Sequence, residues 1–178
     1  CYGDFRSIIG PGSFGLCVSV MLDDLVSLLP KRSPYAHKGA CGRLGIFAGS
    51  VSMLGAAVLV ARAALRSGVG LVYLITVEEA VPHVNIHYPE IIVLPIASTD
   101  GVMTKKSYGQ LLGYMSQYDF DAVAIGPGLG CEKSTVALIR DFVLNYCVPE
   151  HIRMVLDADG LMALKVDDFC DVKDLLLV

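Results

Sequence analysis

The sequence predicts an α/β domain in which a mainly parallel sheet carries helices on both faces. From residue 44 onward, short apolar runs alternate with longer segments of helical pattern, which is typical of parallel strands joined by right-handed crossovers. The apolar runs show little alternation with polar residues, as expected of strands that are buried on both faces. We recognise no hairpin signal of the Asn-Gly kind, which also favours crossovers over hairpins.

The predicted strands and helices follow one another along the chain. Strands are expected over residues 44–48, 71–76, 91–94, 122–125, 152–156 and 175–178. Helices are expected over residues 55–67, 78–84, 107–118 and 133–146, and a further helix begins over 161–165. Gly68 and Gly70 end the first of these helices, because glycine readily adopts the left-handed conformation found after helix C termini. The inward side of the helix over 133–146 is expected to consist of Val136, Ala137, Ile139 and Leu144.

Residues 1–20 differ from the rest of the chain, since they are rich in glycine and serine. Such a stretch is typical of a linker, or of the tail of a preceding domain. A short amphipathic helix is expected over 21–29, with acidic residues near its start and a proline after its end. We therefore place a domain boundary near residue 20 and one domain over 21–178. The start at Cys1 and the end within an apolar run lead us to expect a piece of a longer protein.

The composition excludes several classes of protein. Hydrophobic residues make up 54% of the chain and charged residues 18%, whereas a disordered chain requires low hydrophobicity and high charge. The net charge is −4 and no run of Lys or Arg exceeds two residues, so we expect no nucleic-acid partner. Residues 44–61 are uncharged, but glycines and serines interrupt them, so a strand, a loop and a helix are expected rather than a membrane span.

The six cysteines form no Cys-x-x-Cys pair, and no histidine cluster has the spacing of a zinc site. We therefore expect no metal ligands among them, and free thiols in a reducing, cytoplasmic compartment. The high apolar content favours a homo-oligomer, because it implies surface that becomes buried in an assembly. His83, His87 and His151 are expected at the surface without partners, and we assign no catalytic nucleophile or base.

Three loops that follow predicted strands carry the candidate binding residues, because ligands of open α/β sheets bind beyond the carboxyl ends of the strands. The first loop, residues 48–57, is glycine-rich and leads into a helix N terminus, where free backbone N–H groups favour an anion such as a phosphate. Its glycines and Ala56 remove bulk, so that a ligand can approach the backbone. A tight turn with close helix–sheet packing explains the same residues equally well, and the loop fits neither GxGxxG nor a P-loop.

The second loop, residues 126–130, places three glycines around Pro127 directly after a predicted strand. A rigid loop almost without side chains is suited to hold a ligand, and a simple turn is the alternative.

The third loop, residues 156–160, brings Asp157 and Asp159 to a strand end. Asp157 is expected to bind a ligand hydroxyl or a magnesium–phosphate group, directly or through another residue, whereas Asp159 is expected to cap the following helix.

Together these motifs occur in an order that resembles the NAD(P)H-hydrate dehydratase family of the ribokinase-like fold. The matching stretches are His37-Lys38-Gly39 with Gly42, Ala48-Gly49-Ser50, Gly55-Ala56-Ala57, residues 64–72, Tyr88-Pro89-Glu90, residues 125–130 and residues 156–161. The match in order and spacing extends over residues 21–178. The resemblance implies an incomplete ribokinase-like domain, covering the N-terminal two-thirds of the dehydratase.

The resemblance also implies a reaction. Family members return hydrated NADH or NADPH to the working cofactor. A nucleoside phosphate, ADP in most bacterial members and ATP in eukaryotic ones, phosphorylates the ring hydroxyl, and loss of phosphate restores the double bond. Mg2+ offsets the phosphate charge. By the same match, Ala56 and Gly128 line the NAD(P)H-hydrate site, with Gly126 and Asp157 nearby.

The chain departs from the family pattern in two motifs. A Thr-Pro-His-Pro-Gly-Glu-like segment is absent, and so is a later Gly-x-Gly-Asp-like motif, whose Asp is the base in the family. We therefore expect these 178 residues to be inactive alone. An epimerase domain precedes the dehydratase in many members, which is one interpretation of residues 1–20. The alternatives are a small-molecule alcohol kinase of the same fold and a non-catalytic nucleotide-binding module.

Overall fold

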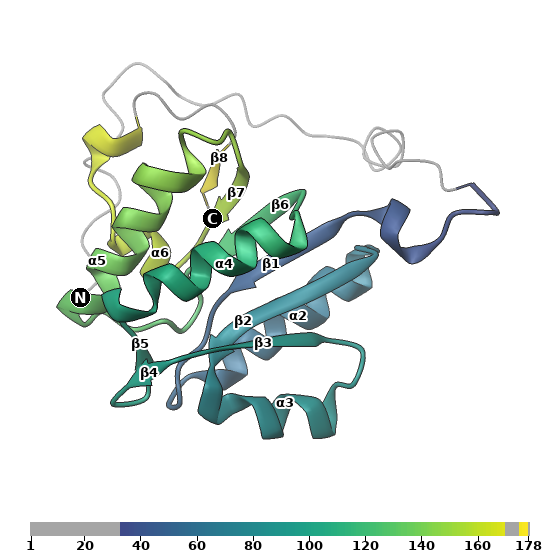
Figure 1. Ribbon diagram of the computed structural model, residues 1–178, viewed down its shortest axis with the longest axis horizontal. Helices are drawn as coiled ribbons and strands as arrows, with labels where there is room; N and C mark the ends of the chain where they lie inside the picture. Colours follow the sequence, from purple (N-terminus) through teal and green to yellow (C-terminus); the bar gives the residue numbers. More distant parts are fainter. Residues whose placement is uncertain (1–32, 170–174, 178) are drawn as a thin grey trace, which may run out of the picture. The chain divides into compact units, whose positions relative to one another are not determined.

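The computed structural model describes residues 33–169 and 175–177. Residues 35–178 form one compact unit that contains the main sheet. The expected domain boundary near residue 20 and the helix expected over 21–29 lie outside the described residues. Figure 1 shows this unit as a twisted sheet with helices packed against it.

Six parallel strands form the main sheet, in the order β3-β2-β1-β6-β7-β8. They are β1 (Arg43–Phe47), β2 (Leu71–Val77), β3 (Ile92–Ile96), β6 (Ala122–Ile125), β7 (Arg153–Leu156) and β8 (Leu175–Leu177). Each strand lies where the apolar runs predict one, with ends that differ by two residues at most. The expected α/β fold with a mainly parallel sheet is confirmed.

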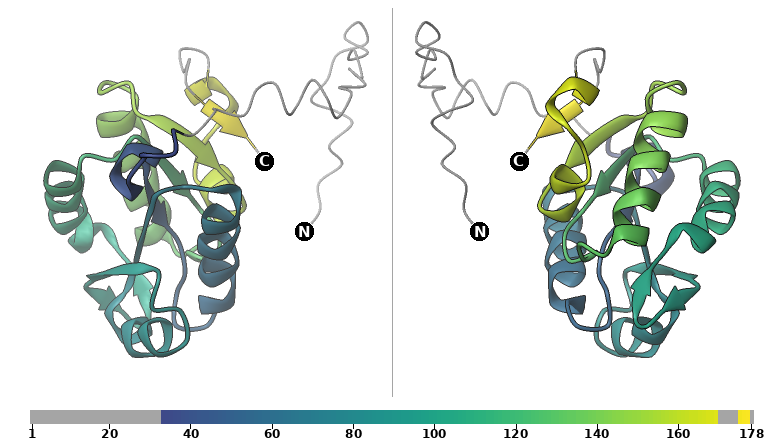
Figure 2. Two further views of the ribbon diagram at one scale, coloured as in Figure 1. Left: turned by 90° about the vertical axis from the view of Figure 1, so that its right-hand side faces the viewer. Right: turned by 90° about the vertical axis from the view of Figure 1, so that its left-hand side faces the viewer.

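Helices cover both faces of this sheet (Figure 2). One face carries α2 (Leu54–Ser67) and α3 (Val81–His87), and the other carries α4 (Tyr108–Tyr118) and α5 (Lys133–Phe142). The shorter helical segments are η2 (Lys38–Cys41), η3 (Glu78–Ala80), η4 (Lys105–Ser107), the π-helical turn η5 (Val143–Cys147), α6 (Asp159–Met162) and η6 (Val166–Phe169). Because helices bury both faces of the sheet, the side chains on both sides of each strand are mainly apolar, and the strands are continuous apolar runs in the sequence.

A separate hydrophobic core lies on each face of the sheet. The buried residues of α2 are Ala57, Ala61 and Ala64, whose small side chains let the helix lie close to the strands. On the opposite face, Ile139 and Phe142 of α5 belong to the larger core. Burial of apolar side chains on two sides of one sheet supplies the main driving force for this fold.

The carboxyl ends of the central strands are aligned. Phe47, the last residue of β1, pairs with Ile75 of β2 and with Ile125, the last residue of β6. Ile125 in turn pairs with Leu156, the last residue of β7. The loops after β1, β6 and β7 therefore leave the sheet side by side at one edge.

A small hairpin follows β3, and the interpretation that no hairpin signal is present was wrong. Its strands β4 (Ser98–Thr99) and β5 (Val102–Met103) pair antiparallel. They are joined by Asp100 and Gly101, which both adopt positive φ, 53° and 76°. Asp-Gly favours the same two-residue turn as Asn-Gly, because both of its residues tolerate positive φ. The sequence therefore does contain a hairpin signal, as Asp-Gly and not as Asn-Gly.

Two further expectations differ from the structure in detail. The buried residues of α5 are Thr135, Leu138, Ile139 and Phe142. Of the predicted inward set, Ile139 is among them, while Val136 and Leu144 are partly buried and pack against the same core. The buried side is fixed by packing against the strands and the hairpin, which periodicity alone does not reveal. The helix expected to begin over 161–165 begins at Asp159 instead. Among the described residues, no helix is long and apolar enough to cross a membrane.

Candidate functional site at the carboxyl edge of the sheet

The three candidate loops meet at the carboxyl edge of the sheet through backbone hydrogen bonds. The Gly49 N–H donates to the Pro127 carbonyl oxygen at 2.9 Å, which joins the first loop to the second. The Asp157 N–H donates to the Ile125 carbonyl oxygen at 3.1 Å, which joins the third loop to the end of β6. The three segments therefore lie together beyond the strand ends.

Gly128 of the second loop packs against the start of α2. Its φ is +73°, and a Cβ at this position would lie 2.8 Å from the Met53 carbonyl oxygen and 3.1 Å from the Ala56 Cβ. A larger residue would therefore separate the loop from the helix. The structure thus places Gly128 and Ala56, the two residues that the resemblance assigns to the substrate site, directly against each other.

Gly126 makes a similar contact with the third loop. Its φ is +132°, and a Cβ there would lie 1.8 Å from the Asp157 carbonyl oxygen. Gly126 and Gly128 are buried, whereas Ala56 and Asp157 are half-buried. The four candidate residues therefore form one group, in which the two glycines bring the loops together and the other two residues reach the surface.

Asp159 does not cap the following helix, contrary to expectation. No side-chain capping bond is found at the start of α6, where Ala158 is the N-cap residue. The Asp159 carboxylate instead accepts hydrogen bonds from the Gly130 N–H at 2.8 Å and from the Cys131 thiol at 3.3 Å. The hydrogen bond to Asp159 raises the pKa of the Cys131 thiol, with burial and the nearby negative charge acting in the same direction. Asp159 therefore joins the third loop to the second.

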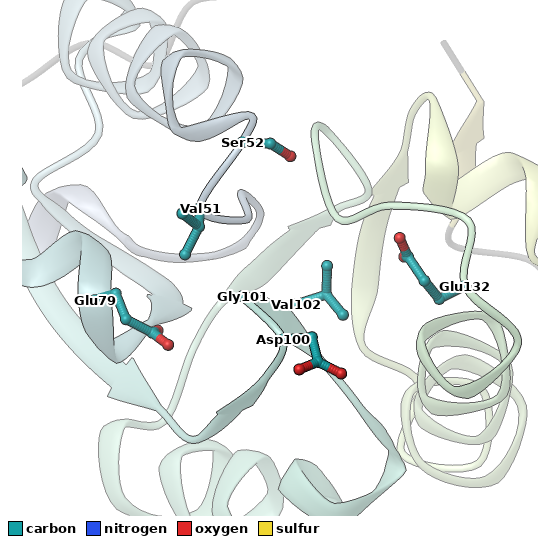
Figure 3. Close-up of a pocket in the computed structure, with 7 residues that line it drawn as sticks. All are labelled: Val51, Ser52, Glu79, Asp100, Gly101, Val102 and Glu132. Carbon is teal, nitrogen blue, oxygen red and sulfur yellow. The ribbon is translucent and has the colours of Figure 1, made fainter.

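A pocket of about 490 Å³ opens beside these loops (Figure 3). It is lined by Val51, Ser52, Glu79, Asp100, Gly101, Val102 and Glu132. The lining comes from the loop after β1, from η3, from the β4–β5 hairpin and from the residue before α5. It includes three carboxylates and no basic side chain, so it suits hydroxyl or amide donors better than a phosphate.

Sequence reasoning missed the acidic lining of this pocket. Glu79, Asp100 and Glu132 lie in three different connections and share no motif. The one available signal was the Asp-Gly pair at 100–101, which predicts a turn but not what the turn faces. His83, His87 and His151 are exposed, as expected.

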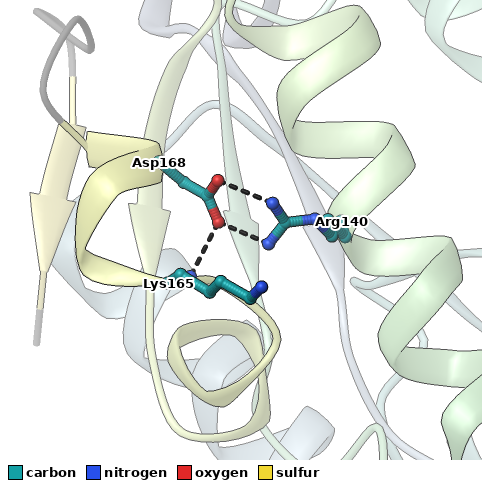
Figure 4. Close-up of polar contacts among 3 residues, drawn as sticks. All are labelled: Arg140, Lys165 and Asp168. Carbon is teal, nitrogen blue, oxygen red and sulfur yellow. Dashed lines mark hydrogen bonds and ion pairs between the residues drawn. The ribbon is translucent and has the colours of Figure 1, made fainter.

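An ion pair away from these loops attaches η6 to α5 (Figure 4). The Arg140 guanidinium donates to both carboxylate oxygens of Asp168, one of them at 2.6 Å, and the Lys165 N–H donates to the same carboxylate at 2.7 Å. These bonds, with Arg140 as the largest cause, lower the pKa of the Asp168 carboxyl. The pair stabilises the connection that follows the third loop.

The part of the chain that carries these loops is similar to known proteins. A sequence model described as NAD(P)H-hydrate dehydratase matches residues 44–174, which include all three loops. The chain belongs to the NAD(P)H-hydrate dehydratase family. The resemblance inferred from the motifs is thereby confirmed. The bifunctional NAD(P)H-hydrate repair enzyme of Dictyoglomus turgidum is 36% identical over 145 residues, covering 82% of this chain and 27% of that enzyme.

Solved structures share the architecture of this dehydratase-family chain. The ADP/ATP-dependent NAD(P)H-hydrate dehydratase from Bacillus subtilis, co-crystallised with ATP/Mg2+, is 28% identical with a TM-score of 0.62, covering 80% of this chain and 46% of that protein. A ribokinase-like superfamily protein from Enterococcus faecalis is 20% identical with a TM-score of 0.67, covering 87% and 51%. The expected ribokinase-like fold is confirmed. The chain spans between a quarter and about half of the length of these proteins.

Proposed function

We propose that this chain forms the part of an NAD(P)H-hydrate dehydratase that binds the hydrated nicotinamide nucleotide. The activity of the whole enzyme would be cofactor repair: ADP- or ATP-dependent dehydration of NAD(P)H hydrate to NAD(P)H, a lyase reaction. A cytoplasmic homo-oligomer without a nucleic-acid or membrane partner belongs to the same proposal. Family membership supports the reaction class, and the geometry of the three loops supports the place of binding.

The observation that carries the proposal is the contact between Gly128 and Ala56. Because Gly128 has no side chain, the second loop packs closely against the start of α2, where the half-buried Ala56 presents only a methyl group to a bound nucleotide. The N terminus of α2 adds backbone N–H groups and a favourable dipole for a phosphate. Ala56 and Asp157 would contact the hydrate, while Gly126 and Gly128 keep the loops close enough to form the site.

The neighbouring pocket extends this site away from the helix N terminus. It shares Val51 and Ser52 with the first loop, so a ligand held at the start of α2 can reach it. Because its charged lining residues are all acidic, we assign it the uncharged, hydroxyl- and amide-bearing part of the substrate rather than a phosphate.

We propose Mg2+ only as an ion that binds together with the nucleoside phosphate. Among the described residues, no group of three or more His, Cys, Asp or Glu side chains is arranged to hold a metal ion. These residues therefore do not form a magnesium site, and Asp157 alone is insufficient for one. Any ion would be held mainly by the phosphates of ADP or ATP.

The test is a comparison of two alanine-to-leucine variants by calorimetric titration with NADH hydrate. Ala56→Leu places bulk between α2 and Gly128, and we expect hydrate affinity to fall at least about tenfold, the size of one lost good contact. Ala63→Leu makes the same change on the exposed side of α2 and should leave affinity unchanged. Equal affinities of both variants and the unmodified chain would contradict the proposed site. Absence of hydrate binding, with tight binding of a hydroxymethyl or thiazole alcohol, would support the kinase alternative.

A further inference from the structure

The β4–β5 hairpin forms one wall of the pocket but is too small to hold its own position. Each strand contains two residues, and isolated two-stranded hairpins are marginal in water even when longer. Three of the seven lining residues, Asp100, Gly101 and Val102, belong to it. The shape of the pocket therefore depends on what attaches the hairpin to the rest of the unit.

On one side, the hairpin tip is attached to the first glycine loop. The Val51 N–H donates to the Gly101 carbonyl oxygen at 2.9 Å. A Cβ at Gly101 would lie 3.0 Å from the Val51 Cβ, so the two segments are in direct contact. This attachment joins two walls of the pocket, because Val51 and Gly101 both line it.

On the other side, the base of the hairpin is attached to α5. The Thr135 hydroxyl donates to the Met103 carbonyl oxygen at 2.6 Å, and both residues are 0% exposed. Met103 follows Val102, and Thr135 lies one turn of helix after Glu132. Because Val102 and Glu132 both line the pocket, this buried bond fixes the distance between the hairpin wall and the wall that precedes α5 (Figure 3).

Two other contacts lie along the same side, and they are exposed. The Lys105 N–H donates to the Ser134 hydroxyl at 3.2 Å, and the Lys105 ammonium pairs with Asp141 at 2.7 Å. Exposed ion pairs contribute little because water screens them, whereas removal of the Thr135 hydroxyl leaves a buried carbonyl without a partner. Among the contacts on the α5 side, the Thr135 bond is therefore the one whose loss is expected to move the hairpin most.

We propose that Thr135 is a positioning residue that sets the width of the substrate pocket by holding the β4–β5 hairpin against α5. It does not touch the substrate and acts through the hairpin. The inference rests on the proposed function for its ligand, the hydrated nicotinamide nucleotide. The attachment itself joins two parts of the chain and involves no ligand.

The first experiment therefore needs no ligand. In native-state hydrogen exchange, Thr135→Val should speed exchange of the Val51 amide at least about tenfold, because that amide is bonded to the hairpin tip. Thr135→Ser retains the hydroxyl and should restore slow exchange. Ile139→Val, a buried change one turn further along α5, should leave the Val51 amide unaffected. Unchanged exchange in Thr135→Val, or equal acceleration in Ile139→Val, would overturn the positioning role.

The second experiment measures the dissociation constant for NADH hydrate in the same variants. We expect about tenfold weaker binding for Thr135→Val, and unmodified affinity for Thr135→Ser and Ile139→Val. Unaltered affinity in Thr135→Val alongside faster exchange would overturn the link between hairpin position and substrate binding. If the unmodified chain binds no hydrate, the proposed function fails, and the exchange data still decide whether Thr135 positions the hairpin.

Discussion

Replacing Gly126 with alanine is expected to be among the most damaging single changes in the described part of the chain. The added Cβ would lie 1.8 Å from the Asp157 carbonyl oxygen and 2.6 Å from the Gly160 nitrogen, both of them backbone atoms that cannot rotate away. The native φ of +132° is also one that residues with a Cβ rarely adopt. The second and third loops must therefore separate, or Gly126 must change its backbone conformation.

The expected loss in the free energy of unfolding follows from the backbone strain and from the hydrogen bonds that are broken. Backbone strain at such a φ costs about 1–3 kcal/mol. Separation of the loops also breaks the two hydrogen bonds that join them, from the Asp157 N–H to the Ile125 carbonyl oxygen at 3.1 Å and from the Gly130 N–H to the Asp159 carboxylate at 2.8 Å. Each is worth about 1 kcal/mol, so we expect a loss of about 3–5 kcal/mol in the free energy of unfolding. For a domain of this size that loss lowers Tm by about 10 °C.

Urea unfolding followed by far-ultraviolet circular dichroism measures this loss, since the chain has no tryptophan for fluorescence. The matched control is Gly113→Ala, on the exposed side of α4, where a Cβ would meet no atom within 4 Å. Alanine has the higher helix propensity, so this control should gain up to about 1 kcal/mol. If Gly126→Ala lost less than about 1 kcal/mol, the close contact between the second and third loops would be refuted.

Three further predictions concern titratable groups. Because Arg140 lowers the pKa of Asp168, the stabilisation it provides is complete above the ordinary carboxyl pKa of about 4 and is lost as the pH falls through the lower folded-state value. Unfolding free energies of Asp168→Asn should therefore decline less steeply toward acid pH than those of the unmodified chain, and equal slopes would count against the pair. Burial raises the pKa of the Cys147 thiol to about 12, so iodoacetamide followed by peptide mass spectrometry should show the exposed Cys131 modified before Cys147. Equal rates for these two cysteines would contradict the burial of Cys147. Asp159→Asn removes the main cause that raises the pKa of Cys131, so its alkylation should accelerate several-fold, and a slower reaction would exclude the hydrogen bond.

Local patterns in the sequence were sufficient for most of the fold. The strands were predicted from apolar runs such as 122–125, because a strand buried on both faces must be apolar throughout. The helix predicted over 55–67, which is α2 in the structure, was expected to end at Gly68. Gly68 does adopt the left-handed conformation, with a φ of 101°. The β4–β5 hairpin is also signalled locally, because its Asp100-Gly101 pair favours a two-residue turn.

The sequence allowed each site residue to be predicted within its own loop, but not the residues of other loops that it contacts. The loops that carry Ala56, Gly126, Gly128 and Asp157 were recognised because they follow strands, and the family resemblance pointed to these four residues within them. The parallel alignment of the strands brought the loops together. The partner of Asp159 could not be predicted, since its carboxylate bonds to Gly130 and Cys131 of a different loop. A capping role was the local alternative, and the carboxylate instead accepts tertiary hydrogen bonds from a backbone amide and a thiol.

The sequence by itself determined the order of strands and helices, the glycine loops at the strand ends and the family to which the chain belongs. Only the tertiary structure decided that Gly128 lies against Ala56, that three carboxylates from separate connections line one pocket, and that Thr135 holds the hairpin. The physical reason is that periodicity reports whether a residue is buried, while its partner depends on the order of strands in the sheet. That order, with β1 between β2 and β6, is set by the packing of the whole unit and by no single segment.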